Sequence, residues 1–303
     1  MLDDLLNKLT IEAEPFSLCE LSPSGWLEMP RSKAASLHYV LAGNGALHLG
    51  AGNSHPIESG DLILVPATNR HAIGAADGRF VSFANCQPAS LGLAHHRTGT
   101  PDDRQGLLVL CARISVGLKG AGQVIDLLRM PVLERPEHLE RDRGLIDLVL
   151  NALAAPQPGS LAQIKAILLF LIIDTLRHAI DRNDPATGWL VALADIRLWP
   201  ALAAVLETPG ADHSVESLAD HVGMSRSRFA AKFRESFGSG PMQMVKELRL
   251  QYAARLLLEG KSGVAKVAEL VGFSSRSHFT QQFEARYDVS PARYGKAALS
   301  KQP

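Results

Sequence analysis

The sequence predicts a two-domain α+β protein, in which an N-terminal antiparallel β-barrel with flanking helices is followed by an all-α domain. Three observations lead to this prediction. Short β-type segments separated by glycine turns fill roughly the first 115 residues, one helical pattern occurs twice in the last third, and 303 residues is a length typical of two domains. We expect the first domain, with its closing helices and linker, to span residues 1–188 and the second to span 189–303.

The β-type segments are short and end at residues that favour tight turns. Glycine and asparagine tolerate the backbone angles that turns require, so each such cluster is expected to separate two strands. Regular spacing of this kind is typical of an antiparallel barrel or sandwich. The segments are Ser36–Leu41, Ala46–Gly50, Asp61–Val65 and Leu107–Ile114, and the turns are expected at Gly43-Asn44-Gly45, Gly52-Asn53 and Gly60-Asp61.

An apolar helix is expected after the strands, over Leu161–Ile180. Lys165, Asp174 and Arg177 interrupt it, so it is too charged to span a membrane. It is either a mostly buried helix of the first domain or the seam of a homodimer, and burial in the core is the preferred interpretation. The first six residues lack the basic region and long apolar run of a signal peptide, so we expect a cytoplasmic protein.

The last third of the chain contains the same helix-turn-helix pattern twice. In each copy a short helix ends at a glycine, a serine follows, and a second helix carries phenylalanines at positions i and i+4. Gly223 and Gly272 lie 49 residues apart, whereas Phe229 and Phe279 lie 50 apart, so the second turn holds one additional residue. The two units are expected at about 214–237 and 263–287.

The glycine and the serine have separate roles in this turn. Glycine permits the positive φ of a tight turn, and a serine hydroxyl can cap the following helix. With the phenylalanines buried, the second helix presents polar side chains, as in a reader of the DNA major groove. An ordinary helical hairpin explains one copy equally well, but two copies with matching core positions favour DNA binding. The outward residues are Arg226, Ser227 and Arg228 in the first copy and Ser275, Arg276, Ser277, His278, Thr280 and Gln281 in the second.

Charge is divided between the two parts, although the whole chain is neutral. From Trp189 onward there are 15 Lys and Arg against 11 Asp and Glu, a net charge of +4, whereas the preceding residues carry 16 against 20, a net charge of −4. A basic C-terminal part suits contact with phosphates. The asymmetry is small and only supports the motif argument.

The repeated segment resembles the DNA-binding domain of the AraC/XylS family of bacterial transcription regulators. The resemblance covers residues from about Asp195 to Lys296 and is carried by the runs SVESLADHVGMSRSRF, KELRLQYAARLLLEG and VAELVGFSSRSHFTQQFEARYDVSPARY. It implies that a long helix, here about Met242 to Leu258, holds both units so that they enter successive major-groove turns on one face of the DNA. It also implies that one chain reads two adjacent half-sites.

The same resemblance implies roles for single residues. Alanine can offer only methyl contacts, for example to thymine, whereas arginine can donate two hydrogen bonds to guanine, so Arg276 is the expected guanine contact. Lys232 and Arg234 are expected to contact phosphates in preference to merely solvating their helix. The positions that match base-reading positions of the family are Ser227, Ala230 and Ala231 in the first copy and Arg276, Ser277, Thr280 and Gln281 in the second.

Two segments of the N-terminal domain resemble the two halves of a cupin, the sensor domain of many AraC-type regulators. They are His38–Gly43 and Gly60–His71. Enzymatic cupins carry a His-x-His pair, a downstream Glu and a later His, which leave open metal positions. Here position 40 is Val, so only His38 and His71 occupy matching places and a dioxygenase-type site is disfavoured.

Cys19, His38, His71 and Cys111 resemble the Cys, His, His, Cys pattern of AraC-type regulators that sense reactive chlorine species. Two thiolates and two imidazoles can fill a tetrahedral zinc shell, and oxidation of Cys19 and Cys111 to a disulfide or a sulfenic acid would remove ligands and alter barrel packing. The alternative is that both cysteines only fill space, as buried cysteines often do. Cys86 is expected to be a packing residue.

The sequence therefore predicts a one-component, sequence-specific transcription regulator with no catalytic residue, and the family resemblance favours an activator. The expected partners are double-stranded promoter DNA, RNA polymerase by family resemblance, and an inducer or oxidant; a homodimer is an open alternative. Two other functions also stay open. The barrel could hold a small organic effector without metal or redox chemistry, or it could be a cupin enzyme fused to a DNA-binding domain.

Overall fold

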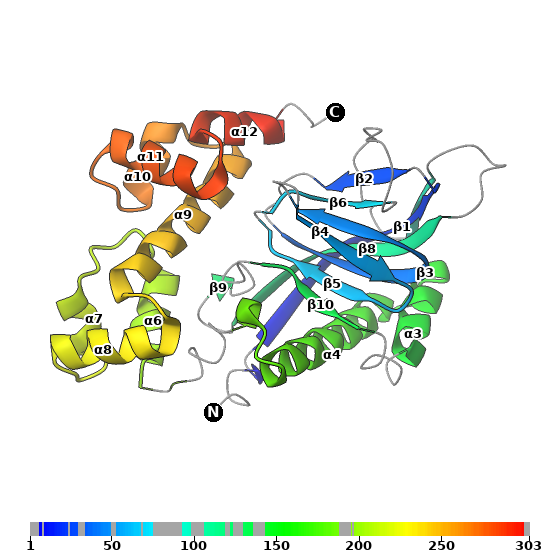
Figure 1. Ribbon diagram of the computed structural model, residues 1–303, viewed down its shortest axis with the longest axis horizontal. Coiled ribbons are helices and arrows are strands. Elements are labelled where there is room, and N and C mark those ends of the chain that lie inside the picture. The colour runs from blue at the N-terminus through cyan, green and yellow to red at the C-terminus, as the bar shows by residue number, and fades with distance from the viewer. Residues whose placement is uncertain are drawn as a thin grey trace. The chain divides into compact units, whose positions relative to one another are not determined.

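We describe the protein from a computed structural model. The structure describes residues 6–7, 9–23, 25–29, 34–49, 53–67, 69–74, 93–97, 106–118, 122–123, 130–135, 143–187, 195 and 197–299. The chain forms two compact units (Figure 1). The sensor unit is built from Thr10–Val116 and Leu128–Ala186, and the second unit is built mainly from Thr187–Pro303.

The sensor unit contains the strands and two of the longer helices. Its strands are β1 (Leu9–Leu21), β2 (Trp26–Met29), β3 (Ala35–Leu49), β4 (Asn53–Glu58), β5 (Leu62–Val65), β6 (His71–Gly74), β7 (Leu93–Arg97), β8 (Leu107–Leu118) and β10 (Val132–Glu134). The short β9 (Gly122–Gln123) pairs antiparallel with the end of β8 and is grouped with the second unit. Its helices are α3 (Arg143–Ala154), α4 (Ser160–Asp181) and the 3-10 helix η3 (Pro185–Thr187).

The strands form a barrel-like sheet in the order β10-β5-β3-β8-β1-β7, to which β4 and β6 are added along β3 and β2 along β6. The described registers are antiparallel with one exception, the parallel pair β1 and β7. This confirms the predicted class of the N-terminal domain.

The expected break at Gly43-Asn44-Gly45 is wrong, because β3 runs through it as one bent strand. Its first half pairs with β5 and β8 and its second half with β4 and β6. The register with β8 shifts between Val40 and Ala42, and such a bulge bends a strand without ending it. Gly43 has φ +86°, and a Cβ there would lie 2.0 Å from the Gly106 carbonyl oxygen, so glycine permits the bend and not a turn.

The two faces of the sheet bury different sets of side chains. One face holds a core cluster that includes Cys19, Cys111 and Ile63. On the other face α4 packs against β10 and α3 (Figure 1). Nine α4 residues are buried, as expected of a core helix, whereas Leu161 and Phe170 are exposed, so the dimer seam remains an open alternative.

The second unit consists of helices. They are α6 (Trp199–Glu207), α7 (Val215–His221), α8 (Arg226–Phe237), α9 (Pro241–Glu259), α10 (Val264–Leu270), α11 (Arg276–Tyr287) and α12 (Pro291–Leu299). Helices α7 and α8 form the first helix-turn-helix pair and α10 and α11 the second, with the long α9 between them in the chain (Figure 1).

Local chemistry fixes the two helix pairs in the same way. Gly223 and Gly272 adopt positive φ in the turns, and the Ser225 and Ser275 hydroxyls accept hydrogen bonds from the backbone N–H groups three residues later. Phe279 and Phe283 belong to a cluster of buried aromatic side chains in which neighbouring ring centroids lie about 5 Å apart. Within the described parts of the chain, no helix is long and apolar enough to cross a membrane.

Candidate DNA-binding surface and sensor site

The second helix of each pair presents its predicted DNA-binding residues at the surface. The phenylalanines are buried on the opposite side of both helices, so their burial fixes which side chains face outward. Ala230, Lys232 and Thr280 are half-buried. The exposed residues are Arg226, Ser227, Arg228, Ala231 and Arg234 on α8, the capping Ser275, and Arg276, Ser277, His278 and Gln281 on α11.

Lys232 has a partner within the protein. Its Nζ lies 2.8 Å from Asp195 Oδ2, and both side chains are mostly enclosed, at 18% and 13% exposure. Arg197 also donates to this carboxylate, and Arg197 foremost, helped by Lys232, holds the pKa of Asp195 well below its usual range. The predicted phosphate contact of Lys232 stays a prediction that must compete with this ion pair.

Arg226 is paired far more loosely. Its guanidinium contacts Glu216 of α7 at 2.7 Å, but the two side chains are 68% and 58% exposed. Solvent screens such a pair, so it contributes little stability and can be exchanged for a phosphate.

Two kinds of contact join the helix pairs, hydrogen bonds from the Arg249 side chain and a close approach of two backbone segments, and neither was predicted from the sequence. Arg249 of α9 donates to the Pro209 and Ala211 carbonyls at 3.0 and 2.7 Å. Between these two residues, Gly210 lies so close to the second pair that a Cβ would meet the Leu270 oxygen at 2.1 Å, and Gly272 packs back against Gly210. An arginine inside a helical pattern gives no sequence signal for such a clamp, because its partners are carbonyls distant in the chain.

The sensor unit brings three of the four predicted Cys and His residues into direct contact. His38 on β3 is the register partner of Cys111 on β8, and His71 begins β6. Cys19 lies on β1, the next strand beyond β8, and belongs to the same core cluster as Cys111. All four side chains are buried.

Hydrogen bonds connect Cys111, His38 and His71 in a row, and each group donates a hydrogen bond to the next one. His71 Nδ1 lies 3.2 Å from the Asn69 carbonyl oxygen, which can only accept, so His71 donates there and its Nε2 must accept. His38 Nε2, at 2.9 Å, therefore donates to His71 Nε2, which leaves His38 Nδ1 as the acceptor for the Cys111 thiol at 3.2 Å. We refer to Cys111, His38 and His71 as the thiol–imidazole chain.

Burial keeps both imidazoles of the thiol–imidazole chain neutral. Desolvation lowers the pKa of His38 well below its usual value, and the neighbouring His71 lowers it further. Desolvation also lowers the pKa of His71, to about 4, against a smaller opposing effect of its bond to Asn69. At neutral pH both imidazoles are therefore uncharged, and His38 is a weak base beside the Cys111 sulfur.

The predicted zinc shell of Cys19, His38, His71 and Cys111 does not fit this arrangement. Cys111 and His71 contact opposite ring nitrogens of His38, so one ion could not be bound by all three without rotation of a ring. Among the described residues no group of three or more His, Cys, Asp or Glu is arranged to hold a metal. Zinc binding thus stays a prediction, and Cys86 lies outside the described residues.

Comparison with known proteins agrees with the two units. The family model described as Cupin matches residues 1–181, and that described as Helix-turn-helix domain matches residues 218–297. The chain therefore belongs to the cupin family through its N-terminal part, and its C-terminal part is a helix-turn-helix domain of the AraC/XylS type.

Individual relatives are regulators of the same kind. An uncharacterized HTH-type transcriptional regulator of Haemophilus influenzae is 28% identical over 97% of this chain and 99% of its own length. The HTH-type transcriptional regulator AlkR of Acinetobacter baylyi is 29% identical over 85% and 86%. The RCS-specific HTH-type transcriptional activator RclR of Escherichia coli is 38% identical over 53% and 57%.

Among solved structures, ToxT of Vibrio cholerae aligns with 95% of this chain and 98% of its own, at 13% identity and a TM-score of 0.48. This alignment is too weak to define the fold, which rests on the strand pairing and helix packing described above.

Proposed function

We propose that this regulator activates transcription by reading two adjacent half-sites with α8 and α11, in response to oxidation of a thiol in its cupin unit. Promoter DNA, RNA polymerase and a reactive chlorine oxidant are the partners in this proposal. The directed thiol–imidazole chain carries it, because an oxidisable sulfur is placed against a proton acceptor in an otherwise apolar core. The relative RclR is described as an activator specific for RCS, that is, reactive chlorine species, and this description supports the choice of oxidant.

The chemistry balances with hypochlorous acid as the oxidant. The Cys111 sulfur attacks chlorine, and its proton moves to His38 Nδ1. The hydroxide that leaves then takes this proton from His38 and becomes water. The Cys19 sulfur then displaces chloride from the S–Cl bond, which forms a disulfide and releases the Cys19 proton. Because the imidazoles are weak bases at rest, we expect Cys111 to be inert toward mild oxidants and to react with a strong one.

Cysteine variants test this proposal. Purified protein is treated with one to three equivalents of hypochlorous acid, its thiol state is determined by mass spectrometry, and its affinity is measured for a duplex selected from random DNA by the wild type. We expect Cys111→Ser and Cys19→Ser to abolish the change in affinity, and Cys86→Ser, the matched control, to preserve it. A Cys19→Ser, Cys111→Ser double variant that still responds would exclude the thiol mechanism and favour an organic effector.

Zinc and self-association are tested on the same preparations. Elemental analysis of protein purified without chelator should give close to one zinc per chain if the predicted Cys2His2 site forms, with loss in the double cysteine variant.

Sedimentation equilibrium decides between monomer and homodimer. Replacing the exposed Phe170 of α4 by Ser should abolish a dimer built on that helix and leave a monomer unchanged.

A further inference from the structure

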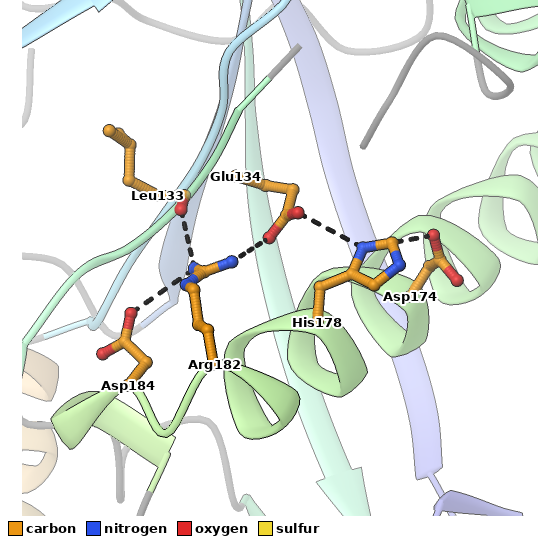
Figure 2. Close-up of polar contacts among 6 residues, drawn as sticks. All are labelled: Leu133, Glu134, Asp174, His178, Arg182 and Asp184. Atoms are coloured by element: carbon orange, nitrogen blue, oxygen red, sulfur yellow. Dashed lines mark hydrogen bonds and ion pairs between the residues drawn. The ribbon is translucent and has the colours of Figure 1, made fainter. Parts of the chain in front are cut away.

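A polar cluster made of Glu134, Asp174, His178, Arg182 and Asp184 lies where β10 meets the C-terminal end of α4 and the residues that follow it (Figure 2). Glu134 is the last residue of β10 and is fully buried. Arg182 follows α4 and donates to Glu134 Oε2 at 2.7 Å, and His178 Nδ1 lies 3.2 Å from Glu134 Oε1. We call this set the β10–α4 latch.

The β10–α4 latch ends at the segment that leaves the sensor unit. Arg182 lies 3.4 Å from Asp184 Oδ2, and Asp184 Oδ1 accepts the Ala186 backbone N–H at 2.9 Å. Ala186 is the last residue of the sensor unit, and Thr187 belongs to the unit that carries the DNA-binding helices. The latch therefore determines how the last residues of the sensor unit are held.

The other end of the latch is connected to the thiol–imidazole chain by one row of paired residues. Cys111 pairs with His38, His38 pairs with Ile63 of β5, and Ile63 pairs with Leu133 of β10. Arg182 Nη2 then donates to the Leu133 carbonyl at 2.8 Å. The row crosses four adjacent strands, and no flexible segment intervenes between the buried thiol and the guanidinium.

The latch has the physical character of a device with two states. A carboxylate buried as completely as Glu134 is stable only while its cation stays in place. A small displacement of β10 that takes the Leu133 carbonyl away from Arg182 therefore cannot be absorbed gradually, because the same guanidinium also neutralises Glu134. Packed interfaces of this kind change between discrete arrangements.

We propose that the β10–α4 latch transmits the state of the thiol–imidazole chain to the segment that leads into the DNA-binding unit. A change at Cys111 or His38 shifts the row of β8, β3, β5 and β10, and Arg182 passes this shift to Asp184 and Ala186. The inference rests on the proposed function in so far as the signal arrives at Cys111. It adds the residues through which that signal leaves the sensor unit.

The test is a double-mutant cycle on full-length protein, with the affinity for the selected duplex as the readout. The variants are Cys111→Ser, Arg182→Gln and their combination. Arg177→Gln supplies the matched control, because Arg177 lies near the end of α4 with the same charge and an exposed side chain but is not part of the β10–α4 latch. Circular dichroism and thermal melting establish that each variant folds, and Asp184→Asn replaces Arg182→Gln if the latter does not.

We expect the effects of Cys111→Ser and Arg182→Gln to be non-additive by roughly fivefold or more in affinity, and those of Cys111→Ser and Arg177→Gln to be additive within twofold. Additive effects in both cycles overturn the latch. The oxidation proposal fails separately: if hypochlorous acid leaves the wild-type affinity unchanged, the signal is wrong, while the cycle still decides whether the latch couples the two units.

Discussion

At the scale of single residues, the sensor site depends on which nitrogen of each imidazole carries the proton. One backbone carbonyl, that of Asn69, determines the order of donors from Cys111 through His38 to His71. The Asn69 carbonyl is uncharged, yet it fixes the tautomer of His71, and through His71 that of His38. Asn69 therefore fixes which ring nitrogen of His38 accepts the Cys111 thiol, although it does not touch the sulfur.

The depressed pKa of His71 should make stability depend on pH. Between pH 6.5 and about 4 the unfolded chain binds a proton at this residue and the folded chain does not, so the free energy of unfolding should fall as the pH falls through this window. The contribution is fully present above pH 6.5 and amounts to about 3 kcal/mol at most. Urea unfolding with a chelator present should show a pH slope for His71→Gln that is smaller by about one proton, and equal slopes would contradict the shift.

Arg276 and Arg226 occupy equivalent positions, each directly after the capping serine of its helix. We expect Arg276→Ala to weaken binding of the selected duplex by about 1 to 3 kcal/mol and to weaken binding of random DNA much less, because a guanine contact is lost. Arg226→Ala should weaken both equally, as a phosphate contact does. Fluorescence anisotropy on the two duplexes measures this, and an equal loss for Arg276→Ala leaves that residue only a phosphate role.

At the scale of elements, the same turn has different surroundings in the two helix pairs. Gly223 and Gly272 both adopt positive φ, but the space around Gly223 is open, whereas a Cβ on Gly272 would lie 2.7 Å from the Gly210 oxygen and 2.9 Å from Arg249. The turn at Gly272 is therefore part of the junction between the two helix pairs, whereas the turn at Gly223 lies outside it.

This difference predicts two costs for the same substitution. Gly223→Ala should destabilise the protein by about 1 to 2 kcal/mol, through the left-handed backbone conformation alone. Gly272→Ala should cost more, because the Gly210 backbone must also move. It should also lower the affinity for a duplex with both half-sites. Urea denaturation of both variants provides the comparison, and equal destabilisation would show that the close approach to Gly210 is not rigid.

At the scale of the whole molecule, recognition should be unequal between the two half-sites. The exposed face of α11 carries Arg276, Ser277, His278 and Gln281, whereas α8 exposes mainly arginine and alanine. Side chains that form hydrogen bonds can distinguish base edges. A helix face of arginine and alanine is suited instead to phosphate contacts and to fitting the shape of the groove. Duplexes selected from random DNA should therefore show stronger base preference in the half-site bound by α11. Equal preference in both half-sites would contradict this division.

Most of the fold was predictable because it follows from local patterns. Buried phenylalanines at i and i+4, a glycine turn and a serine cap define each helix pair without help from the rest of the chain. The predicted strand boundary at Gly43 is wrong because the glycine serves a contact that is not local: its backbone approaches Gly106, which is distant in sequence. The ion pair of Lys232 with Asp195 also joins residues far apart in the chain, because Asp195 lies before α6, and the phosphate contact of Lys232 stays a prediction.

Helical periodicity and turn chemistry act within a few residues, so the order of amino acids is enough to predict the class of protein, its two units and the side chains exposed on α8 and α11. Three contacts depend on the three-dimensional fold: His38 lies between Cys111 and His71, Arg249 connects the two helix pairs, and Glu134 is buried against Arg182. These contacts join strands and helices far apart in the chain. Their strength comes from burial, which no local pattern records.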